Sequence, residues 1–366
     1  MVIVHIVLGK ANPERMNGVN KVVYNLAKNQ VDLGRNIELW GITDQLEHNY
    51  GERNFKTRLF KKSKVPFTIS NKLKKAIIEK EDVVFHLHGG WIPDFWPIAK
   101  TLKKHGKKCI LTPHGAYNQI AMKKSPFIKK IYFSLFEKSL LDSMDTIHCI
   151  GESEKIGLEE IYQNDKQALL PYGFDVVPNN NPVANNSKKF TIGFVGRIDV
   201  HTKGLDLLVK AFSAFKIGKD VKLWIVGDSS ELPHLQDVSS DLGITNDTVF
   251  FGSKFGDAKN RLLQEMDVFV HASRNEGLPT AVLEAASFGV PSIVTKATNV
   301  GDYIVKHNAG ICINNESITE LTEAFENLYL DWKNANMKNY STGAKAMLDE
   351  EFSWKNLVGK YDLLYA

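Results

Sequence analysis

The chain has 366 residues, of which 43% are hydrophobic and 24% charged, an ordinary composition for a soluble globular protein. This length favours two domains, because one hydrophobic core rarely grows beyond about 250–300 residues. The apolar runs, such as Val2–Leu8 and Val290–Val294, are far shorter than the ~18 residues that span a bilayer. The three scattered cysteines exclude a disulfide framework and a four-cysteine metal site.

The start of the chain and the charge distribution bear on location. Met1 leads directly into an apolar strand, without the basic segment or the cleavage site of a signal peptide, so we expect a cytoplasmic protein. Residues 1–180 hold 27 Lys/Arg against 19 Asp/Glu (+8), whereas residues 181–366 hold 19 against 23 (−4). A basic half beside an acidic half suggests that one half faces an anionic partner. Solvated lysines on helix faces are the alternative.

The first half alternates between strand and helix patterns. A run of β-branched residues predicts a strand over Val2–Val7, and helical spacing predicts a helix over Val19–Ala27. Further strands are expected at Asn36–Trp40, Val83–Leu87, Lys108–Leu111 and Thr146–Ile150. This alternation is typical of a parallel sheet built from crossover units.

The Asn- and Pro-rich segment Pro178–Ser187 predicts a linker, after which the alternation restarts. The second half is expected to contain strands at Phe190–Val195, Val221–Val226, Val249–Phe251, Val268–Val270 and Pro291–Val294, and helices at Gly204–Phe215 and Thr280–Phe288. We therefore predict two doubly wound α/β domains, residues 1–180 and 188–350, followed by an amphipathic helix over 353–366. Ligands of open α/β sheets bind at the carboxyl ends of the strands, here in a cleft between the two sheets.

Several common cofactor motifs are absent. The sequence has no G-x-G-x-x-G after the first strand and no Walker motif, which argues against a nicotinamide, flavin or P-loop site. It also has no Asp-x-Asp pair of the kind that holds a diphosphate-bound metal. His86 and His88 could bind a metal, but no third ligand is spaced to complete a site.

The segment Ser273–Ala285 carries the strongest signal for a binding site. A strand ends near His271, a short Gly/Pro loop follows, and a helix begins around Thr280. A helix N-terminus offers free N–H groups and positive potential to a phosphate. Glu276 lies just before that helix and Glu284 two turns into it, so the two carboxylates can accept hydroxyl groups of one ligand. A capped helix with two surface glutamates is the alternative.

Two cations follow the first strand of the second half. Arg197 comes directly after that strand and Lys203 precedes the next helix. Arginine offers a planar fork to phosphate oxygens and lysine a point charge. Without a metal, such cations and helix N–H groups are what a departing diphosphate requires. Two surface cations near a turn would be the simpler explanation.

Nearly the whole chain resembles the retaining glycosyltransferases of family 4, which have the GT-B fold. The resemblance is carried by the following motifs: Gly196-Arg197 with Lys203-Gly204, Val226-Gly227-Asp228, Phe250-Phe251-Gly252, Glu276 and Glu284 separated by seven residues, Gly289-Val290-Pro291, and Phe352-Ser353-Trp354 at the start of a terminal helix. It implies two Rossmann-like domains facing each other across a cleft. The terminal helix, 353–366, would cross back onto the first domain.

The resemblance implies a role for each matching residue. Arg197 and Lys203 would hold the donor diphosphate, Glu276 the hydroxyls of the transferred sugar, and Glu284 the ribose hydroxyls. Donor contacts are also implied for Gly252, Gly277, Leu278, Pro279 and Thr280, and in the first half for Gly18, where the family's phosphate loop has often two glycines and this chain has one. His114 would lie beside the reacting carbon. Apart from the resemblance, His88 and Trp91 lie at a second His-rich strand end, where we expect them to form a wall on the acceptor side or simply to pack against the strand end.

These residues lead us to expect a hexosyltransferase that transfers sugar, with retention, from a UDP- or GDP-linked donor to an acceptor hydroxyl. The acceptor would be a saccharide or lipid-linked saccharide in polysaccharide biosynthesis, with no metal or other cofactor required. A nucleotide-sugar epimerase on the same scaffold and a non-catalytic sugar-nucleotide binding protein are the alternatives.

Lysines interleaved with apolar residues around Phe127–Phe133 suggest peripheral contact with the inner face of a membrane. A packed helix with a solvated lysine face explains the same pattern. Nucleic acid is not expected as a partner, because no recognised binding module accompanies the charge.

Overall fold

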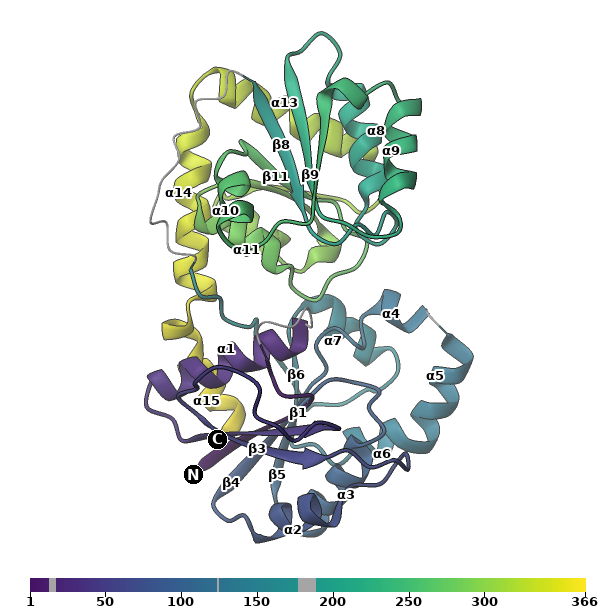
Figure 1. The fold of residues 1–366 in the computed structure, drawn as a ribbon, viewed down its shortest axis with the longest axis vertical. Helices are drawn as coiled ribbons and strands as arrows, with labels where there is room; N and C mark the ends of the chain where they lie inside the picture. Colours follow the sequence, from purple (N-terminus) through teal and green to yellow (C-terminus); the bar gives the residue numbers. More distant parts are fainter. Residues whose placement is uncertain (13–17, 124, 177–188) are drawn as a thin grey trace. The chain divides into compact units, whose positions relative to one another are not determined.

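A computed structural model describes residues 1–12, 18–123, 125–176 and 189–366. The expected linker at Pro178–Ser187 lies outside the described residues. The chain divides into two compact units (Figure 1). The first unit combines Met1–Asp175 with Trp354–Ala366, and the second unit comprises Val176–Ser353.

The first unit is built on a seven-stranded parallel sheet in the order β3-β2-β1-β4-β5-β6-β7. Its strands are β1 (Val2–Leu8), β2 (Ile37–Thr43), β3 (Lys56–Lys61), β4 (Val83–His88), β5 (Lys108–Thr112), β6 (Thr146–Cys149) and β7 (Gln167–Leu169). Its helices are α1 (Gly18–Asp32), α2 (Asn71–Glu79), α3 (Phe95–Lys104), α4 (Gln119–Lys123), α5 (Pro126–Tyr132), the π-helix η1 (Phe133–Glu137), α6 (Lys138–Leu141), α7 (Glu152–Glu159) and α15 (Trp354–Tyr365).

Alternate residues of the first sheet face two separate cores. Ile3 and Val7 of β1 belong to the core that α1 and α15 cover, whereas Val4 and Ile6 belong to the core under α2, α3 and α6. Because side chains alternate across a strand, a sheet that is covered on both faces needs the continuous apolar runs seen in the sequence. The terminal helix α15 thus forms part of the first unit.

The second unit has a six-stranded parallel sheet in the order β10-β9-β8-β11-β12-β13. Its strands are β8 (Phe190–Val195), β9 (Val221–Val226), β10 (Thr248–Gly252), β11 (Val268–His271), β12 (Ser292–Thr295) and β13 (Gly310–Ile313). Its helices are α8 (Leu205–Phe215), α9 (Leu232–Asp241), η2 (Thr245–Asp247), α10 (Gly256–Gln264), α11 (Thr280–Ser287), η3 (Lys296–Thr298), α12 (Gly301–Lys306), α13 (Ile318–Lys333), α14 (Met337–Met347) and η4 (Leu348–Phe352).

Two parallel sheets, each covered by helices, confirm the predicted α/β class with two doubly wound, Rossmann-like units of the GT-B type. The strands expected from apolar runs are all present. β3, β7 and β13 were not among the predicted strands. No helix in the described ranges is both long and apolar enough to cross a membrane.

The order of the strands fixes where a ligand site can form. In each sheet the order in which successive strands are added reverses once, between β1 and β4 in the first unit and between β8 and β11 in the second. Loops diverge at such a switch point and leave space at the carboxyl ends of the strands. Of the residues singled out in the sequence, His114 follows β5, Arg197 follows β8 and Glu276 follows β11.

Candidate functional site

His114 follows β5 in the first unit, in a loop with an unusual backbone. Its φ of 56° lies in the left-handed region, which costs about 1–2 kcal/mol for residues other than glycine. The buried carboxylate of Glu154 holds the loop in this conformation, because it accepts a hydrogen bond from the N–H of Gly115 at 2.5 Å and another from Ile150 at 3.3 Å. Burial raises the pKa of Glu154 to about 7, although these N–H groups favour its charge. The hydrogen bonds to Glu154 therefore fix the position of the loop that carries His114.

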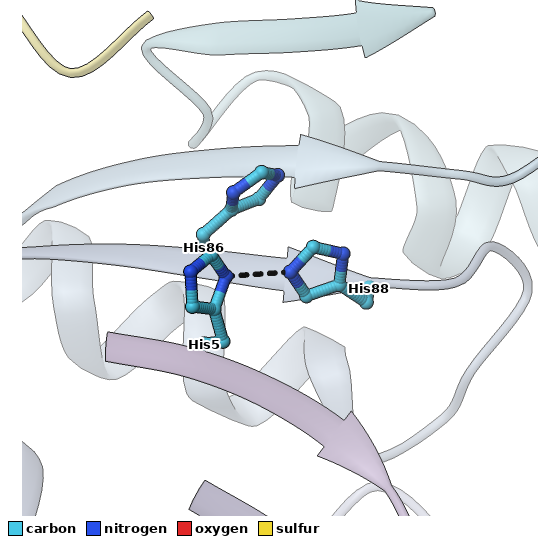
Figure 2. A group of neighbouring side chains, drawn as sticks. All are labelled: His5, His86 and His88. Atoms are coloured by element: carbon cyan, nitrogen blue, oxygen red, sulfur yellow. Dashed lines mark hydrogen bonds between the residues drawn. The ribbon is translucent and has the colours of Figure 1, made fainter. Parts of the chain in front are cut away.

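His114 and His88 lie together. Nε2 of His114 is 3.0 Å from Nδ1 of His88, the last residue of β4. The other ring nitrogen of His88 is 2.9 Å from Nδ1 of His5 on the neighbouring strand β1 (Figure 2). His88 is thus buried with both nitrogens engaged. Trp91 donates its backbone N–H to Glu137 and its indole N–H to the carbonyl of Ala116, each at 3.0 Å.

A cavity of about 330 Å³ lies at this switch point. Asn20 of α1, Gly90 after β4 and His114 after β5 are among its lining residues. Gly18 is the first residue of α1, and a side chain added there would meet no atom within 4 Å. The residue before it, Asn17, lies outside the described residues.

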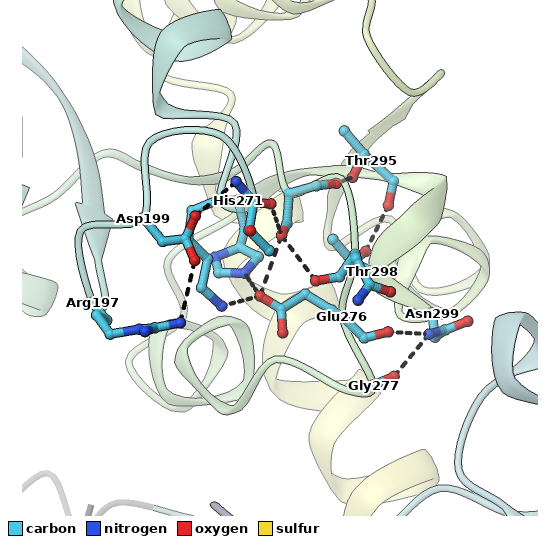
Figure 3. A network of polar contacts seen from close by, with 12 residues as sticks. Arg197, Asp199, His271, Glu276, Gly277, Thr295, Thr298 and Asn299 are labelled. Carbon is cyan, nitrogen blue, oxygen red and sulfur yellow. Dashed lines mark hydrogen bonds and ion pairs between the residues drawn. The ribbon is translucent and has the colours of Figure 1, made fainter. Parts of the chain in front are cut away.

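In the second unit, Glu276 is the centre of a polar network at the switch point (Figure 3). Its Oε1 accepts a hydrogen bond from Nε2 of His271 at 2.8 Å and from the hydroxyl of Ser273 at 3.3 Å, and it pairs with the ammonium of Lys203. Burial alone would raise the pKa of Glu276. The hydrogen bond to His271 and the charges of His271 and Lys203 outweigh it and lower the pKa to about 2. Glu276 therefore stays ionised at neutral pH.

The loop that carries Glu276 is anchored at both ends. The amide of Asn299 donates to the carbonyls of Glu276 and Gly277 at 2.7 and 2.8 Å (Figure 3). Arg274 pairs with Asp206 at 2.7 Å and Glu316 at 2.5 Å. These contacts fix the backbone between β11 and α11. The fixed backbone in turn positions the carboxylate of Glu276.

The two predicted phosphate-binding cations lie in different environments. Lys203 reaches Glu276, whereas Arg197 pairs with Asp199 at 3.2 Å and keeps 67% of its side chain exposed. Gly204, which follows Lys203, has a φ of 64°, and a Cβ there would come within 2.0 Å of the carbonyl oxygen of Ala272. Only glycine fits this close approach of the two loops, which brings Lys203 to Glu276.

The other predicted donor residues surround the start of α11. Leu278 is buried, Pro279 precedes the helix and Thr280 is its first residue. Glu284 lies about one turn into α11 and pairs with Lys259 of α10 at 2.6 Å. Gly252 ends β10 with a φ of 65°.

Three neighbours of the site were not predicted from the sequence. His271 was regarded only as the end of a strand, and nothing in the local pattern indicates Lys259 or Asn299. Their partners are 5, 25 and 23 residues away, so only the fold brings them together. The sequence pattern also predicted no third imidazole to accompany His86 and His88. In the structure His5 joins them, with ring nitrogens within 4.8 Å of one another, so among the described residues these three could hold a metal ion.

The comparisons with known proteins identify related glycosyltransferases. The model of glycosyltransferase family 4 matches residues 16–177, and that of glycosyl transferases group 1 matches residues 178–345. A GDP-mannose:cellobiosyl-diphosphopolyprenol alpha-mannosyltransferase of Xanthomonas oryzae is 24% identical over 78% of this chain and 73% of its own length. One further curated relative, 28% identical, is matched over only 42% of its length.

Solved structures share the fold of the whole chain. A glycosyltransferase from Rickettsia africae superimposes with a TM-score of 0.77 and 21% identity, covering 100% of this chain and 97% of the other. HepE of Anabaena, solved in complex with UDP, gives a TM-score of 0.75 and 14% identity over 100% and 99%. Since the two family models together match nearly the whole chain, this protein belongs to the glycosyltransferases of family 4, with a group 1 domain as its second half.

Proposed function

We propose that this glycosyltransferase transfers a sugar, with retention, from a UDP- or GDP-linked donor to a hydroxyl of a saccharide or lipid-linked saccharide. Residues of the second unit hold the donor and residues of the first unit bind the acceptor. The observation that carries this proposal is the ionised carboxylate of Glu276, which accepts hydrogen bonds from Lys203, His271 and Ser273. A buried carboxylate that keeps its charge is a strong acceptor for sugar hydroxyl groups.

The roles of the remaining groups follow from their charge and position. Arg197 and Lys203, with the N–H groups at the start of α11, stabilise the departing diphosphate without a metal. Glu284 binds the ribose hydroxyls. The UDP in HepE and the GDP-mannose in the name of the Xanthomonas enzyme support a nucleoside diphosphate donor, and the polyprenol-linked substrate in that name supports a lipid-linked acceptor.

A thermal-shift screen with UDP, GDP and their sugar conjugates tests the donor assignment, because a ligand that binds only the folded state raises its stability. We expect Glu276→Gln to abolish the extra stabilisation by the sugar conjugate while keeping that by the free nucleotide. Glu284→Gln should weaken both. Stabilisation by neither nucleotide nor conjugate in the wild type would contradict the proposal.

Activity measurements separate the remaining alternatives. NMR of donor with protein alone detects an epimerase, which converts the donor without an acceptor. With an acceptor, the anomeric coupling of the product reports retention, and full turnover in EDTA is expected of a metal-independent enzyme. Absence of both hydrolysis and transfer with every donor that binds would point to a non-catalytic binding protein.

A further inference from the structure

Five histidines of the first unit belong to one continuous chain of hydrogen bonds. It runs from the carbonyl of Leu170 to the ring of His114 through the following side chains: His148, Thr112, His86, Tyr365, Gln30, His5 and His88. We call this set the histidine relay. Its members come from β1, α1, β4, β5, β6 and the terminal helix α15. The relay ends at the cavity that His114 lines.

The relay has one direction, set by its buried end. The carbonyl of Leu170 can only accept, so His148 must carry its proton on Nε2, at 2.6 Å. Its bare Nδ1 then accepts from the hydroxyl of Thr112 at 2.7 Å, and Thr112 accepts from Nε2 of His86 at 2.6 Å. The bare Nδ1 of His86 in turn accepts from the hydroxyl of Tyr365 at 3.0 Å.

The same logic continues to His114. The hydroxyl of Tyr365 donates its hydrogen bond to His86, so its oxygen accepts from the amide of Gln30 at 3.1 Å. The amide oxygen of Gln30 accepts from Nε2 of His5 at 2.7 Å. Nδ1 of His5 accepts from Nε2 of His88 at 2.9 Å, and Nδ1 of His88 accepts from Nε2 of His114 at 3.0 Å. Every neutral ring thus carries its proton on Nε2.

The reverse arrangement is disfavoured. It would place a bare Nε2 of His148 against the carbonyl of Leu170, leaving two acceptors face to face in a buried site. Burial also keeps the rings neutral, since it lowers the pKa of His5 and His148 to about 4, that of His114 to about 3, and those of His86 and His88 well below the usual 6.5.

A metal at His5, His86 and His88 would need lone pairs that this scheme already uses. Of their six ring nitrogens, three are donors and three accept from a neighbour. A bound ion would therefore have to displace several buried hydrogen bonds. The hydrogen bonds of these three histidines therefore favour the relay over a metal site.

We propose that the histidine relay holds His114 in the tautomer protonated at Nε2, so that its bare Nδ1 accepts a hydrogen bond from a substrate hydroxyl in the adjoining cavity. Tyr365 and Gln30 are then positioning residues for His114, although neither touches the substrate. The hydroxyl-bearing substrate is taken from the proposed function, whereas the tautomer depends on the relay alone.

NMR of the imidazole nitrogens tests the relay in the full-length protein without substrate, because the chemical shifts of Nδ1 and Nε2 report which of them carries the proton. We expect all five rings to be protonated on Nε2 at pH 7. Tyr365→Phe removes the link between the two halves of the relay. His86 and His148 should keep their tautomer, while His5, His88 and His114 should become mixtures.

A matched control lies on the same helix. Tyr361 is equally buried and donates to the carbonyl of Pro171 at 3.4 Å, outside the relay, so Tyr361→Phe should leave all five tautomers unchanged. Gln30→Met breaks the relay at a second point and should reproduce the mixture at His114 if Tyr365→Phe does not fold. An Nδ1-protonated His114 in the wild type, loss of the ring signals to added Zn²⁺ at equimolar ratio, or an unchanged His114 in both variants would overturn the relay.

Activity then tests the consequence for the substrate. We expect kcat to fall about two- to fivefold in Tyr365→Phe and Gln30→Met with little change in KM, and to remain unchanged in Tyr361→Phe. Mixed tautomers with unchanged kcat would overturn the role of Nδ1 but leave the relay and the proposed function intact. A failure of donor binding in the wild type would instead affect the proposed function alone.

Discussion

Glu276 combines burial with a full negative charge. The free energy cost of burying that charge is met by His271, Lys203 and Ser273, all of which contact the same oxygen, Oε1. In our proposal the charged carboxylate also accepts a ligand hydroxyl. A neutral amide in its place would form weaker hydrogen bonds, because bonds to charged groups contribute about 1.5–3 kcal/mol against about 0.5–1.5 for neutral ones.

We therefore expect Glu276→Gln to lower kcat/KM by about 10- to 100-fold, with steady-state kinetics on the donor found by the binding screen. Glu326→Gln is a suitable control, since Glu326 pairs with Lys219 at 2.8 Å on the surface of the same unit. Activity of Glu276→Gln within twofold of the control would be inconsistent with a hydroxyl-binding role.

Lys203 and Arg197 should act later in the reaction, when negative charge develops on the leaving diphosphate. Removing one such cation typically costs about 2–4 kcal/mol of transition-state stabilisation, so Lys203→Ala and Arg197→Ala should each reduce kcat by about 30- to 1,000-fold. Lys222→Ala, which removes an ion pair with Asp247, provides the comparison. Near wild-type turnover in both site variants would refute their assignment.

At the level of elements, the sequence predicted strands from short runs dominated by β-branched and other apolar residues. β1 and β8 are buried on both faces, and this is what a run of β-branched residues encodes. β3 (Lys56–Lys61) was missed because it lies at the edge of the sheet and carries three basic residues, a composition that edge strands tolerate and that protects them from pairing.

The site was predictable to the extent that its residues share a short motif. Glu276 and Lys203 stood out because each follows a strand and precedes a helix. The histidine relay did not, because Tyr365 lies 335 residues from Gln30 and 279 from His86. No local spacing can indicate such a contact, which arises from the packing of α15 onto the first unit.

The continuous helical segment α5–η1 exposes an apolar stripe. Phe127, Ile128, Ile131 and Leu135 are 74, 68, 47 and 61% exposed. Lys130 lies exposed on the same segment, and Lys138, the first residue of α6, lies exposed directly after it. Since residues three to four apart share a helix face, this stripe matches a basic amphipathic surface that lies on anionic lipid. We infer that the first unit contacts a membrane here, near a lipid-linked acceptor.

Flotation with vesicles containing phosphatidylglycerol tests this contact. We expect the protein to float at low salt, and Phe127→Ser with Ile128→Ser to reduce the bound fraction at least fivefold. Ile217→Ser removes an equally exposed apolar residue, 76% exposed, in the second unit and should not change binding. No flotation of the wild type at low salt would exclude the membrane contact.

At the scale of the whole molecule, the buried histidines make the first unit sensitive to acid. The folded pKa values of His5, His148 and His114 are lowered to about 4, 4 and 3, and those of His86 and His88 are also lowered. Between about pH 6.5 and pH 4 the unfolded chain therefore binds protons that the folded unit does not, so the free energy of unfolding falls as the pH falls.

The size of this effect is large compared with the stability of a domain. Each histidine contributes a slope of ~1.4 kcal/mol per pH unit, so the five together contribute on the order of 7. The raised pKa values of Glu154, about 7, and of Glu137 and Asp94 oppose this effect, because these carboxyls bind protons in the folded unit at a higher pH than in the unfolded chain. Against a total stability of about 5–15 kcal/mol, this slope predicts that the first unit loses stability as the pH falls below about 6.5 and unfolds at a higher pH than the second unit.

The second unit provides an internal control. Its shifted carboxylates act differently: the lowered pKa of Glu276, about 2, costs stability only as the pH falls below 4.5, and the raised pKa of Asp267, about 6, favours the folded state on acidification. Hydrogen exchange at pH 7, 6, 5 and 4, normalised to the unfolded chain at each pH, should show peptides of β1, β4 and α15 losing protection before those of β8 and β11. Simultaneous loss in both units, or protection of the first unit down to pH 4, would contradict neutral buried histidines and with them the basis of the relay's single direction.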